Sequence, residues 1–306
     1  MILVTLVAAL IAQYAYPPAE RPPLPALYGR LCLSAAKRLN AGDRNSGVLA
    51  YFALVAVALV PLAAVSALAA AIHPVVLAVL DAAVLYASLR FLQTTSHLGA
   101  IERSLREGDA ASASRRLAQW QGEAPFSDDP GTTARLAAEH GLREAHLGTF
   151  AILFWFLVLP GPLGVVLYPL TQRAARLWDL GVDPDEREFG WFAGRAFEVL
   201  DWVPQRVTAF VFAIVGDFED ALFCWRSQAA QWLRPEEGIV LASGAGALGV
   251  RLGDALVRGE ALVDRPALGT GDPAGEDALA SLEGMLWRSL VLWFVAYLLV
   301  ASLSFP

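Results

Sequence analysis

The stretch VLAYFALVAVALVPLAAVSALAAAI, at residues 48–72, contains no charged side chain. A helix of roughly 20 apolar residues crosses the hydrocarbon core of a bilayer, which is about 30 Å thick. A soluble domain could not cover so long an apolar run, and Pro61 marks the point where we expect the helix to bend. The stretch therefore predicts an all-α fold of the polytopic, helical, integral membrane class.

The composition of the whole chain agrees with this class. Of its 306 residues, 56% are hydrophobic and 17% are charged, whereas soluble domains carry about 25% charged residues. The net charge of -7 and the lack of a basic surface argue against a nucleic-acid partner. Cys32 and Cys224 are too few and too far apart for a disulfide framework or a metal cluster, so we expect them to pack in the core.

Four other apolar runs predict further membrane segments. The run at Met1–Tyr16 has no basic residues at its N-terminal end and no small-residue cleavage site, so we interpret it as a retained membrane segment rather than a signal peptide. We expect His73-Pro74 to form a tight turn between two spans. We also expect a hairpin at Pro160-Gly161-Pro162 that returns the chain to the cytoplasm. The predicted spans are Met1–Tyr16, Val48–Ile72, Val75–Leu92, Leu147–Leu170 and Trp287–Leu303.

Two shorter apolar stretches fit a simple crossing poorly. Val207–Val215 is about half a membrane thickness long at ~1.5 Å per residue, and Ile239–Leu252, with the sequence IVLASGAGALGVRL, is rich in glycine. Such segments are typical of re-entrant or broken helices that line a protein cavity, because unpaired backbone groups cannot face lipid. The alternative is a buried helix in a domain beside the membrane, and the sequence leaves both open.

Basic residues predict the orientation, because they concentrate between the first two spans and between the third and fourth. The positive-inside rule places both segments in the cytoplasm. We therefore expect a cytoplasmic helical region, with a helical hairpin over Leu98–Trp120 that Asp109 caps. A second helix is predicted to begin at Asp183-Pro184 and to end at Pro204. The predicted regions are 1–97 (membrane segments with a basic loop), 98–146 (a cytoplasmic helical hairpin) and 147–306 (a membrane core with cytoplasmic helices and a C-terminal transmembrane helix).

Four short motifs carry a resemblance to a known family. They are Ala-Ile-Leu-Phe-Trp at 151–155, Leu-Asp-Trp-Val-Pro-Gln-Arg at 200–206, Gly-Asp-Phe-Glu-Asp at 216–220, and Gly-Ala-Leu-Gly-Val-Arg-Leu-Gly at 246–253 with Arg265-Pro266 beyond it. Together they resemble the CobD/CbiB family, the membrane-bound adenosylcobinamide-phosphate synthases of cobalamin biosynthesis, and its relative AmpE. The resemblance extends over residues 140–300 and implies a multi-pass protein of the bacterial inner membrane.

In the synthases, the reaction joins an aminopropanol to the propionate of a corrinoid acid. Activation of that carboxylate with ATP would require acidic residues that hold Mg²⁺ and cations that hold phosphate. The family motifs supply the catalytic and cofactor-binding candidates. We add Asp217 and Asp220 as metal-binding candidates, because they lie one helical turn apart beside an apolar half-helix. The candidates are Asp201, Arg206 and Arg251 for catalysis, Gly246, Gly249 and Gly253 for cofactor binding, and Asp217 and Asp220 for metal.

Each candidate has a structural alternative. Asp201 and Arg206 would pair across a turn at Pro204, and the acidic residues at 217–220 would be a solvated helix start. Asp81 lies inside the third predicted span, where a carboxylate costs about 2.5–3.5 kcal/mol on insertion scales. We therefore expect Asp81 to face protein or water, either as a proton or ligand site or as a group hydrated near the interface.

The sequence also departs from the synthase pattern. The synthases carry Glu-Asn and Asp-Gly shortly before the Phe-Trp segment, and these places are held here by Arg143-Glu144 and Leu147-Gly148. Loss of acidic positions from a retained hydrophobic and glycine scaffold suggests a branch whose chemistry changed or was lost. AmpE is such a branch, associated with signalling in β-lactamase induction. The sequence leaves open whether the chain is an enzyme, whether it acts on a corrinoid or a signalling protein, and whether it forms oligomers in the lipid bilayer.

Overall fold

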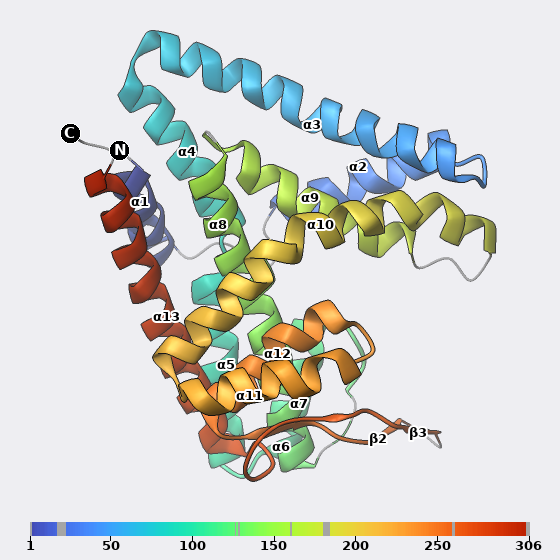
Figure 1. Cartoon of the computed structure of the whole chain (residues 1–306), viewed down its shortest axis with the longest axis vertical. Coiled ribbons are helices and arrows are strands. Elements are labelled where there is room, and N and C mark those ends of the chain that lie inside the picture. Colours follow the sequence, from blue (N-terminus) through green and yellow to red (C-terminus); the bar gives the residue numbers. More distant parts are fainter. Residues whose placement is uncertain are drawn as a thin grey trace. The chain divides into compact units, whose positions relative to one another are not determined.

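The computed structural model describes residues 2–16, 23–125, 127, 129–159, 161–179, 184–258 and 261–303, which are predominantly helical (Figure 1). The chain folds into two compact units. Unit 1 contains Met1–Leu89, Ala151–Trp202 and Tyr297–Pro306, and unit 2 contains Arg90–Phe150 and Val203–Ala296. The predicted region boundaries at 97/98 and 146/147 fall inside helical segments of unit 2.

Unit 1 packs its helices around aromatic and small side chains. Trp178 and Phe189 lie in this core with Cys32, whose carbonyl accepts a hydrogen bond of 3.1 Å from the Trp178 indole. Gly47 allows a close approach, because a Cβ there would collide with the carbonyl of Phe189. The helices are α1 (Ile2–Ala15), α2 (Pro23–Leu39), α3 (Arg44–Ile72), α4 (Pro74–Ser88), α8 (Ala151–Val158), α9 (Leu163–Trp178) and the first part of α10 (Pro184–Val215).

Helices α3 and α4 confirm the predicted turn at His73-Pro74. His73 ends α3 and begins α4, and its Nδ1 accepts a hydrogen bond of 3.2 Å from the amide of Val75. Pro74 occupies the first turn of α4, where a missing N–H costs nothing. Pro61 lies inside α3, which continues on both sides of it.

The other end of α4 is supported by a side chain of α1. Gln13 is buried, and its Nε2 donates hydrogen bonds of 2.8 and 2.7 Å to the carbonyls of Tyr86 and Leu89. The last carbonyls of a helix have no partner within the helix. Gln13 therefore satisfies two backbone acceptors where α4 stops.

Unit 2 contains the predicted helical hairpin in α5 and α6. Gly108 lies between them in the left-handed region (φ +76°), and the Asp109 carboxylate accepts from the amide of Ser112. The helical elements of unit 2 are α5 (Phe91–Arg106), α6 (Ala110–Gln121), α7 (Pro130–Ala145), the π-helical turn η1 (His146–Phe150), the second part of α10, α11 (Phe218–Gln228), the 3₁₀ turn η2 (Ala229–Gln231), α12 (Pro235–Leu248) and most of α13 (Glu276–Leu303).

Four short strands of unit 2 were not expected from the sequence. β1 (Arg251–Gly253) pairs antiparallel with β4 (Ala267–Gly269), and β2 (Leu256–Arg258) pairs antiparallel with β3 (Ala261–Val263). Each strand is three residues long, which is too short for an alternating pattern to be recognised. They modify an otherwise helical fold.

Four helical segments of the described chain are long and apolar enough to cross a membrane: Arg44–Ile72, Pro74–Arg106, Pro130–Val158 and Glu276–Val300. They confirm a polytopic helical membrane protein. Val4–Ala15 and Glu237–Leu248 are apolar but shorter. α8 ends at Val158 and α9 begins at Leu163, on either side of the expected break at Pro160-Gly161-Pro162. The predicted span over residues 147–170 therefore shares only residues 147–158 with the helical segment that begins at Pro130. Its first half carries polar side chains that the fold buries, so hydropathy alone did not identify it.

The prediction that Pro204 ends a helix was wrong. Pro204 lies inside α10, which continues to Val215, so residues 207–215 are not a separate half-helix. A proline removes one backbone donor, and packing of this part of the helix holds it together, since Gln205 and Thr208 are fully buried. The predicted helix start at Asp183 and the first residue of the Pro160-Gly161-Pro162 break lie outside the described residues.

The glycine-rich stretch at 239–252 forms α12 and then β1. α12 ends at Gly249, which caps it in the left-handed region (φ 66°). Val240, Ala242 and Ala245 are buried, and the helix packs against α7 and α11 of the same unit. These contacts favour the alternative of a helix buried in a protein domain.

Candidate functional site

The three sequence-predicted catalytic residues lie on α10 and in β1. Asp201 is buried in unit 1, and its Oδ1 accepts a hydrogen bond of 2.8 Å from the Tyr168 hydroxyl. Arg206 lies in the part of α10 that belongs to unit 2. Because α10 runs through Pro204, the turn across which these two residues were expected to pair does not exist.

The predicted cofactor-binding glycines each meet a local backbone requirement. A Cβ on Gly246 would lie 2.5 Å from the carbonyl oxygen of Asp220, so this glycine allows α12 to approach α11. Gly249 and Gly253 have φ values of +66° and +76°, which side chains rarely adopt. Their cofactor role stays a prediction, and the structure gives each a packing or turn role.

Arg251 and the acidic pair also lie in unit 2. The Arg251 amide donates to the carbonyl of Asp272 at 2.8 Å, and its Nε is buried without a hydrogen-bond partner. Asp217 caps α11, where its Oδ1 accepts from the Asp220 amide at 3.0 Å. Asp220 accepts a hydrogen bond of 3.0 Å from the Thr270 hydroxyl. The acidic pair therefore has the geometry of a helix start.

The described carboxylates do not complete a Mg²⁺ site by themselves. Within the described ranges, no three or more His, Cys, Asp or Glu side chains are grouped so that they could hold a metal ion. Magnesium requires near-octahedral oxygen coordination. The metal role of Asp217 and Asp220 stays a prediction.

Asp81 lies on α4, inside the candidate span Pro74–Arg106. Its Oδ1 is buried without a hydrogen-bond partner, and a Cβ built on Gly161 would be 3.7 Å from that oxygen. Both residues belong to unit 1. The carboxylate therefore faces the turn that precedes α9, as expected for a group that avoids lipid.

A network of polar contacts in unit 2 centres on Glu139 of α7, which sequence reasoning missed. The Glu139 carboxylate accepts hydrogen bonds of 2.7 and 3.2 Å from Nη1 and Nη2 of Arg265, and one of 2.9 Å from the Gly253 amide. Arg265 also donates to the carbonyls of Gly253 and Asp254, both at 3.2 Å, and its guanidinium lies 5.4 Å from the Trp232 ring centroid. The pair fixes the end of the glycine-rich stretch to α7.

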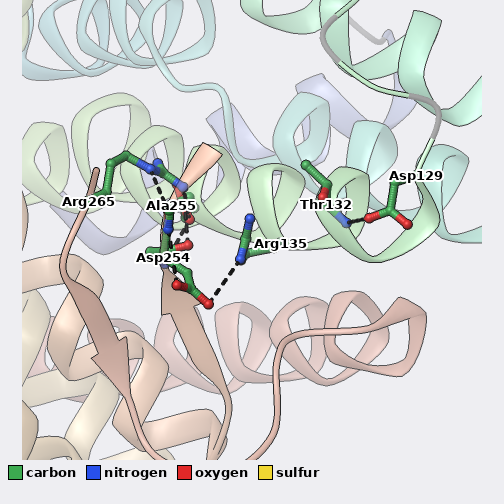
Figure 2. A network of polar contacts seen from close by, with 8 residues as sticks. Asp129, Thr132, Arg135, Asp254, Ala255 and Arg265 are labelled. Carbon is green, nitrogen blue, oxygen red and sulfur yellow. Dashed lines mark hydrogen bonds and ion pairs between the residues drawn. The ribbon is translucent and has the colours of Figure 1, made fainter. Parts of the chain in front are cut away.

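Asp254 occupies the turn that this network holds (Figure 2). Among the described residues, Asp254 is the one non-glycine residue with a positive φ (73°). Positive φ is uncommon for residues other than glycine, but less so for Asp. Its carboxylate accepts from the Ala255 amide at 3.0 Å and lies 3.6 Å from Nη1 of Arg135. Arg135 and Glu139 thus hold the turn from the same helix.

The start of α7 is fixed by a cap. Asp129 accepts a hydrogen bond of 2.7 Å from the backbone amide of Thr132, as Figure 2 shows. The pKa of Asp129 is lowered most by a hydrogen bond from the Thr132 side chain and next by one from the Thr132 backbone amide. The charge of Arg135 also lowers this pKa. The carboxylate is therefore held in its charged form at the helix end where negative charge is favourable.

Only part of this network could have been found in the sequence. Arg265 stands in the Arg-Pro pair that contributed to the resemblance, yet no spacing assigned it a partner. Glu139 lies 126 positions away from it, in a segment with no motif of its own. A pairing over such a distance depends on tertiary structure.

The spans and helices together define a polytopic helical membrane protein. The family model described as CobD/Cbib protein matches residues 6–285 of this chain. The chain belongs to the CobD/CbiB family. No solved structure matches it significantly.

Curated relatives agree with the family match. The Cobalamin biosynthesis protein CobD of Stutzerimonas stutzeri (strain A1501) is 36% identical over 214 residues, which is 70% of each chain. The protein of the same name from Chromobacterium violaceum is 32% identical over 232 residues, 75% of this chain and 73% of the relative. That of Geobacter metallireducens is 27% identical over 265 residues, 83% of this chain and 79% of the relative.

Proposed function

We propose that this chain is a membrane-bound protein of cobalamin biosynthesis that forms an amide between an amine and the propionate of a corrinoid acid. The observation that carries the proposal is the family match over residues 6–285. Relatives that are 36% and 32% identical bear the name Cobalamin biosynthesis protein CobD. The protein would act at the bacterial inner membrane, with its basic loops in the cytoplasm.

The glycine-rich segment supports an intact site. The motif at 246–253 and Arg265, which both contribute to the resemblance, come together through Glu139. A buried carboxylate that receives three hydrogen bonds holds this part of the chain in one geometry. Preorganisation of this kind is what a binding site requires.

The residues would contribute by binding and orientation. Arg251 and Arg265 are cations near the glycine-rich turn, and Asp201 is a buried carboxylate that accepts from Tyr168. ATP and Mg²⁺, if bound, would supply activation of the propionate. The described carboxylates do not complete a metal site by themselves, and magnesium is commonly held by one or two carboxylates together with substrate phosphates. The contribution assigned to this chain is the placement of the two substrates.

A regulatory protein like AmpE is the second candidate, and one observation favours it. Leu147, which replaces an acidic residue of the synthases, is buried in η1. Glu144, which replaces an amide, forms an ion pair of 2.9 Å with Arg90. A site that lost its acidic groups while keeping its fold suits a protein that binds without reacting.

Complementation separates the two candidates. The chain is expressed in a bacterium that lacks its adenosylcobinamide-phosphate synthase and must make cobalamin from a corrinoid acid. We expect growth to be restored, to fail with Asp201→Ala or Arg206→Ala, and to persist with the exposed control Glu188→Gln. Immunoblots of the membrane fraction check that each variant is present.

Failure of the wild-type chain to restore growth, with the protein present in the membrane, would contradict the synthase proposal. A changed response to β-lactam in the same strain would then support the regulator. A strain that carries the empty vector controls for both readouts.

A further inference from the structure

Two candidate membrane spans are irregular at positions that contact each other within unit 2. The span Pro74–Arg106 is interrupted at residues 89–90, directly before α5, and Pro130–Val158 contains the π-helical turn η1. The amide of Arg90 donates to the carbonyl of Gly148 in η1 at 2.9 Å. Interrupted spans inside membrane proteins commonly form ligand sites, because irregular backbone there must line protein or a cavity. π-Helical turns such as η1 are also frequent at functional sites.

An ion pair joins the two irregular segments. Nη1 of Arg90 lies 2.9 Å from the carboxylate of Glu144, with the two side chains 28% and 11% exposed. A Cβ on Gly148 would lie 2.7 Å from Nε of Arg90, so the guanidinium is packed directly onto η1. Glycine at 148 is therefore what admits the arginine.

The surroundings of η1 are polar and partly unsatisfied. His146 and Thr208, both buried, share a hydrogen bond of 2.9 Å. Thr149 of η1 and Gln205, which lies one turn before Thr208, are at most 1% exposed, and Thr149 Oγ1 and Gln205 Oε1 have no hydrogen-bond partner. Buried polar atoms are usually hydrogen-bonded in native proteins, so these two atoms are available to a bound polar group.

The chemistry of Arg90 indicates which ligand this site takes. A guanidinium has five donors in a planar fork that matches a carboxylate, and Glu144 engages Nη1. Arg90 also precedes the first turn of α5 and no side chain caps that turn, so the amide end of a 16-residue helix adds positive potential. Arginine inside a span is costly unless it has a role.

We propose that Arg90 binds the carboxylate of an anionic ligand at the contact between α5 and η1, with Glu144 orienting the guanidinium. This deepens the proposed function, on which the identity of the ligand rests: the carboxylate would be the propionate of the corrinoid acid. The binding of a carboxylate as such does not depend on that function.

The first experiment uses propionate as the probe on the purified full-length protein in detergent. Propionate, compared with chloride at equal ionic strength, raises the unfolding temperature of the wild type, because a ligand that binds the native state stabilises it. Arg90→Gln weakens the apparent affinity at least about tenfold, as expected for loss of a charged hydrogen-bond pair. Glu144→Gln weakens it by a smaller factor, because Arg90 keeps its charge and loses only the carboxylate that orients it. Arg103→Gln, an exposed arginine of the same helix, leaves it unchanged.

A second measurement avoids any variant that fails to fold. Phenylglyoxal modifies accessible arginines of the wild-type protein, and mass spectrometry reports the extent at each site. Propionate protects Arg90 and leaves Arg103 unprotected. Equal modification of Arg90 with and without propionate, together with no effect of propionate on unfolding, would overturn the site.

The final arm tests the ligand. A corrinoid acid and the matching corrinoid amide are titrated and followed by absorbance. The wild type prefers the acid, and Arg90→Gln loses that preference without losing the amide. If neither corrinoid binds while propionate still protects Arg90, the site stands and the proposed function fails. If the acid binds equally well to Arg90→Gln, the function stands and the site is refuted.

Discussion

The segments Arg44–Ile72 and Pro130–Val158 are both long enough to span a membrane, but only 17% of the apolar window is buried in the first and 72% in the second. The first was evident from its sequence, whereas only residues 147–158 of the second were predicted to lie in a span. An exposed span must be apolar on nearly all sides. A span surrounded by protein can carry Glu139 and Glu144, because partners satisfy them. Hydropathy therefore finds the helices that lipid covers and misses those that carry polar networks.

The largest effect is expected when the Glu139 carboxylate of α7 is removed. Glu139→Ala leaves the Arg265 guanidinium and the Gly253 amide without their acceptor, and breaking a buried pair costs about 3–5 kcal/mol. The free energy of unfolding, measured in detergent, is expected to fall by this amount. Glu188→Gln removes half of the exposed pair with Arg44 and should cost at most about 1 kcal/mol. Equal losses in the two variants would show that burial is not what distinguishes them.

A second test concerns the approach of α12 to α11. Gly246→Ala places a methyl group 2.5 Å from the backbone oxygen of Asp220, and overpacking of this kind costs about 1–3 kcal/mol. The matched control is Gly275→Ala, where a Cβ would meet nothing within 4 Å. Thermal unfolding of both variants measures the effect. If Gly246→Ala unfolds like the wild type and yet loses function, the glycine serves a ligand rather than packing.

A third test separates the helix-cap and metal roles of Asp217. Asp217→Ala should lower the free energy of unfolding by about 1 kcal/mol, and Asp217→Asn by much less, because asparagine is an equally good cap. Addition of Mg²⁺ should leave the unfolding temperature of the wild type unchanged if the residue is only a cap. A rise with Mg²⁺ that disappears in Asp217→Asn would instead confirm the metal role.

The smallest expected effect is a pH dependence at the start of α7. The pKa of Asp129 is lowered by the hydrogen bonds from Thr132, so the folded state favours the charged carboxylate. Its contribution to stability is fully present above the unfolded pKa of about 3.9 and is lost as pH falls through the lowered folded value. The protection factors for hydrogen exchange at the first turn of α7, which correct for the slower intrinsic exchange in acid, should fall on acidification in the wild type. Asp129→Asn, which does not titrate, should lack this change.

The fold class and the turn at His73-Pro74 could be predicted because both are local. Apolar runs report lipid contact directly, and a capping residue followed by proline marks a helix start wherever it occurs. The extent of α10 could not be predicted, because packing around Gln205 and Thr208 outweighs the local tendency of Pro204 to end a helix.

The candidate site was predicted less completely. The glycine-rich stretch was recognised, and Gly249 and Gly253 do lie at turns that glycine suits. Glu139, the partner of Gly253, was missed because it lies far from the stretch in sequence and carries no local signature. Arg265 was noted in the Arg-Pro pair, but no spacing assigned it to Glu139. Arg90 was overlooked for the same reason, since its importance depends on the neighbouring η1 turn.

The hydrogen bonds from Gln13 to the C-terminal end of α4 give the N-terminal helix a specific structural role. α1 is shorter than the candidate spans, yet one amide group on it shields two carbonyls that would otherwise meet hydrocarbon. Deleting the first helix, or replacing Gln13 with leucine, would thus damage a segment more than 70 positions away. Expression tags placed ahead of this helix should be chosen with that coupling in view.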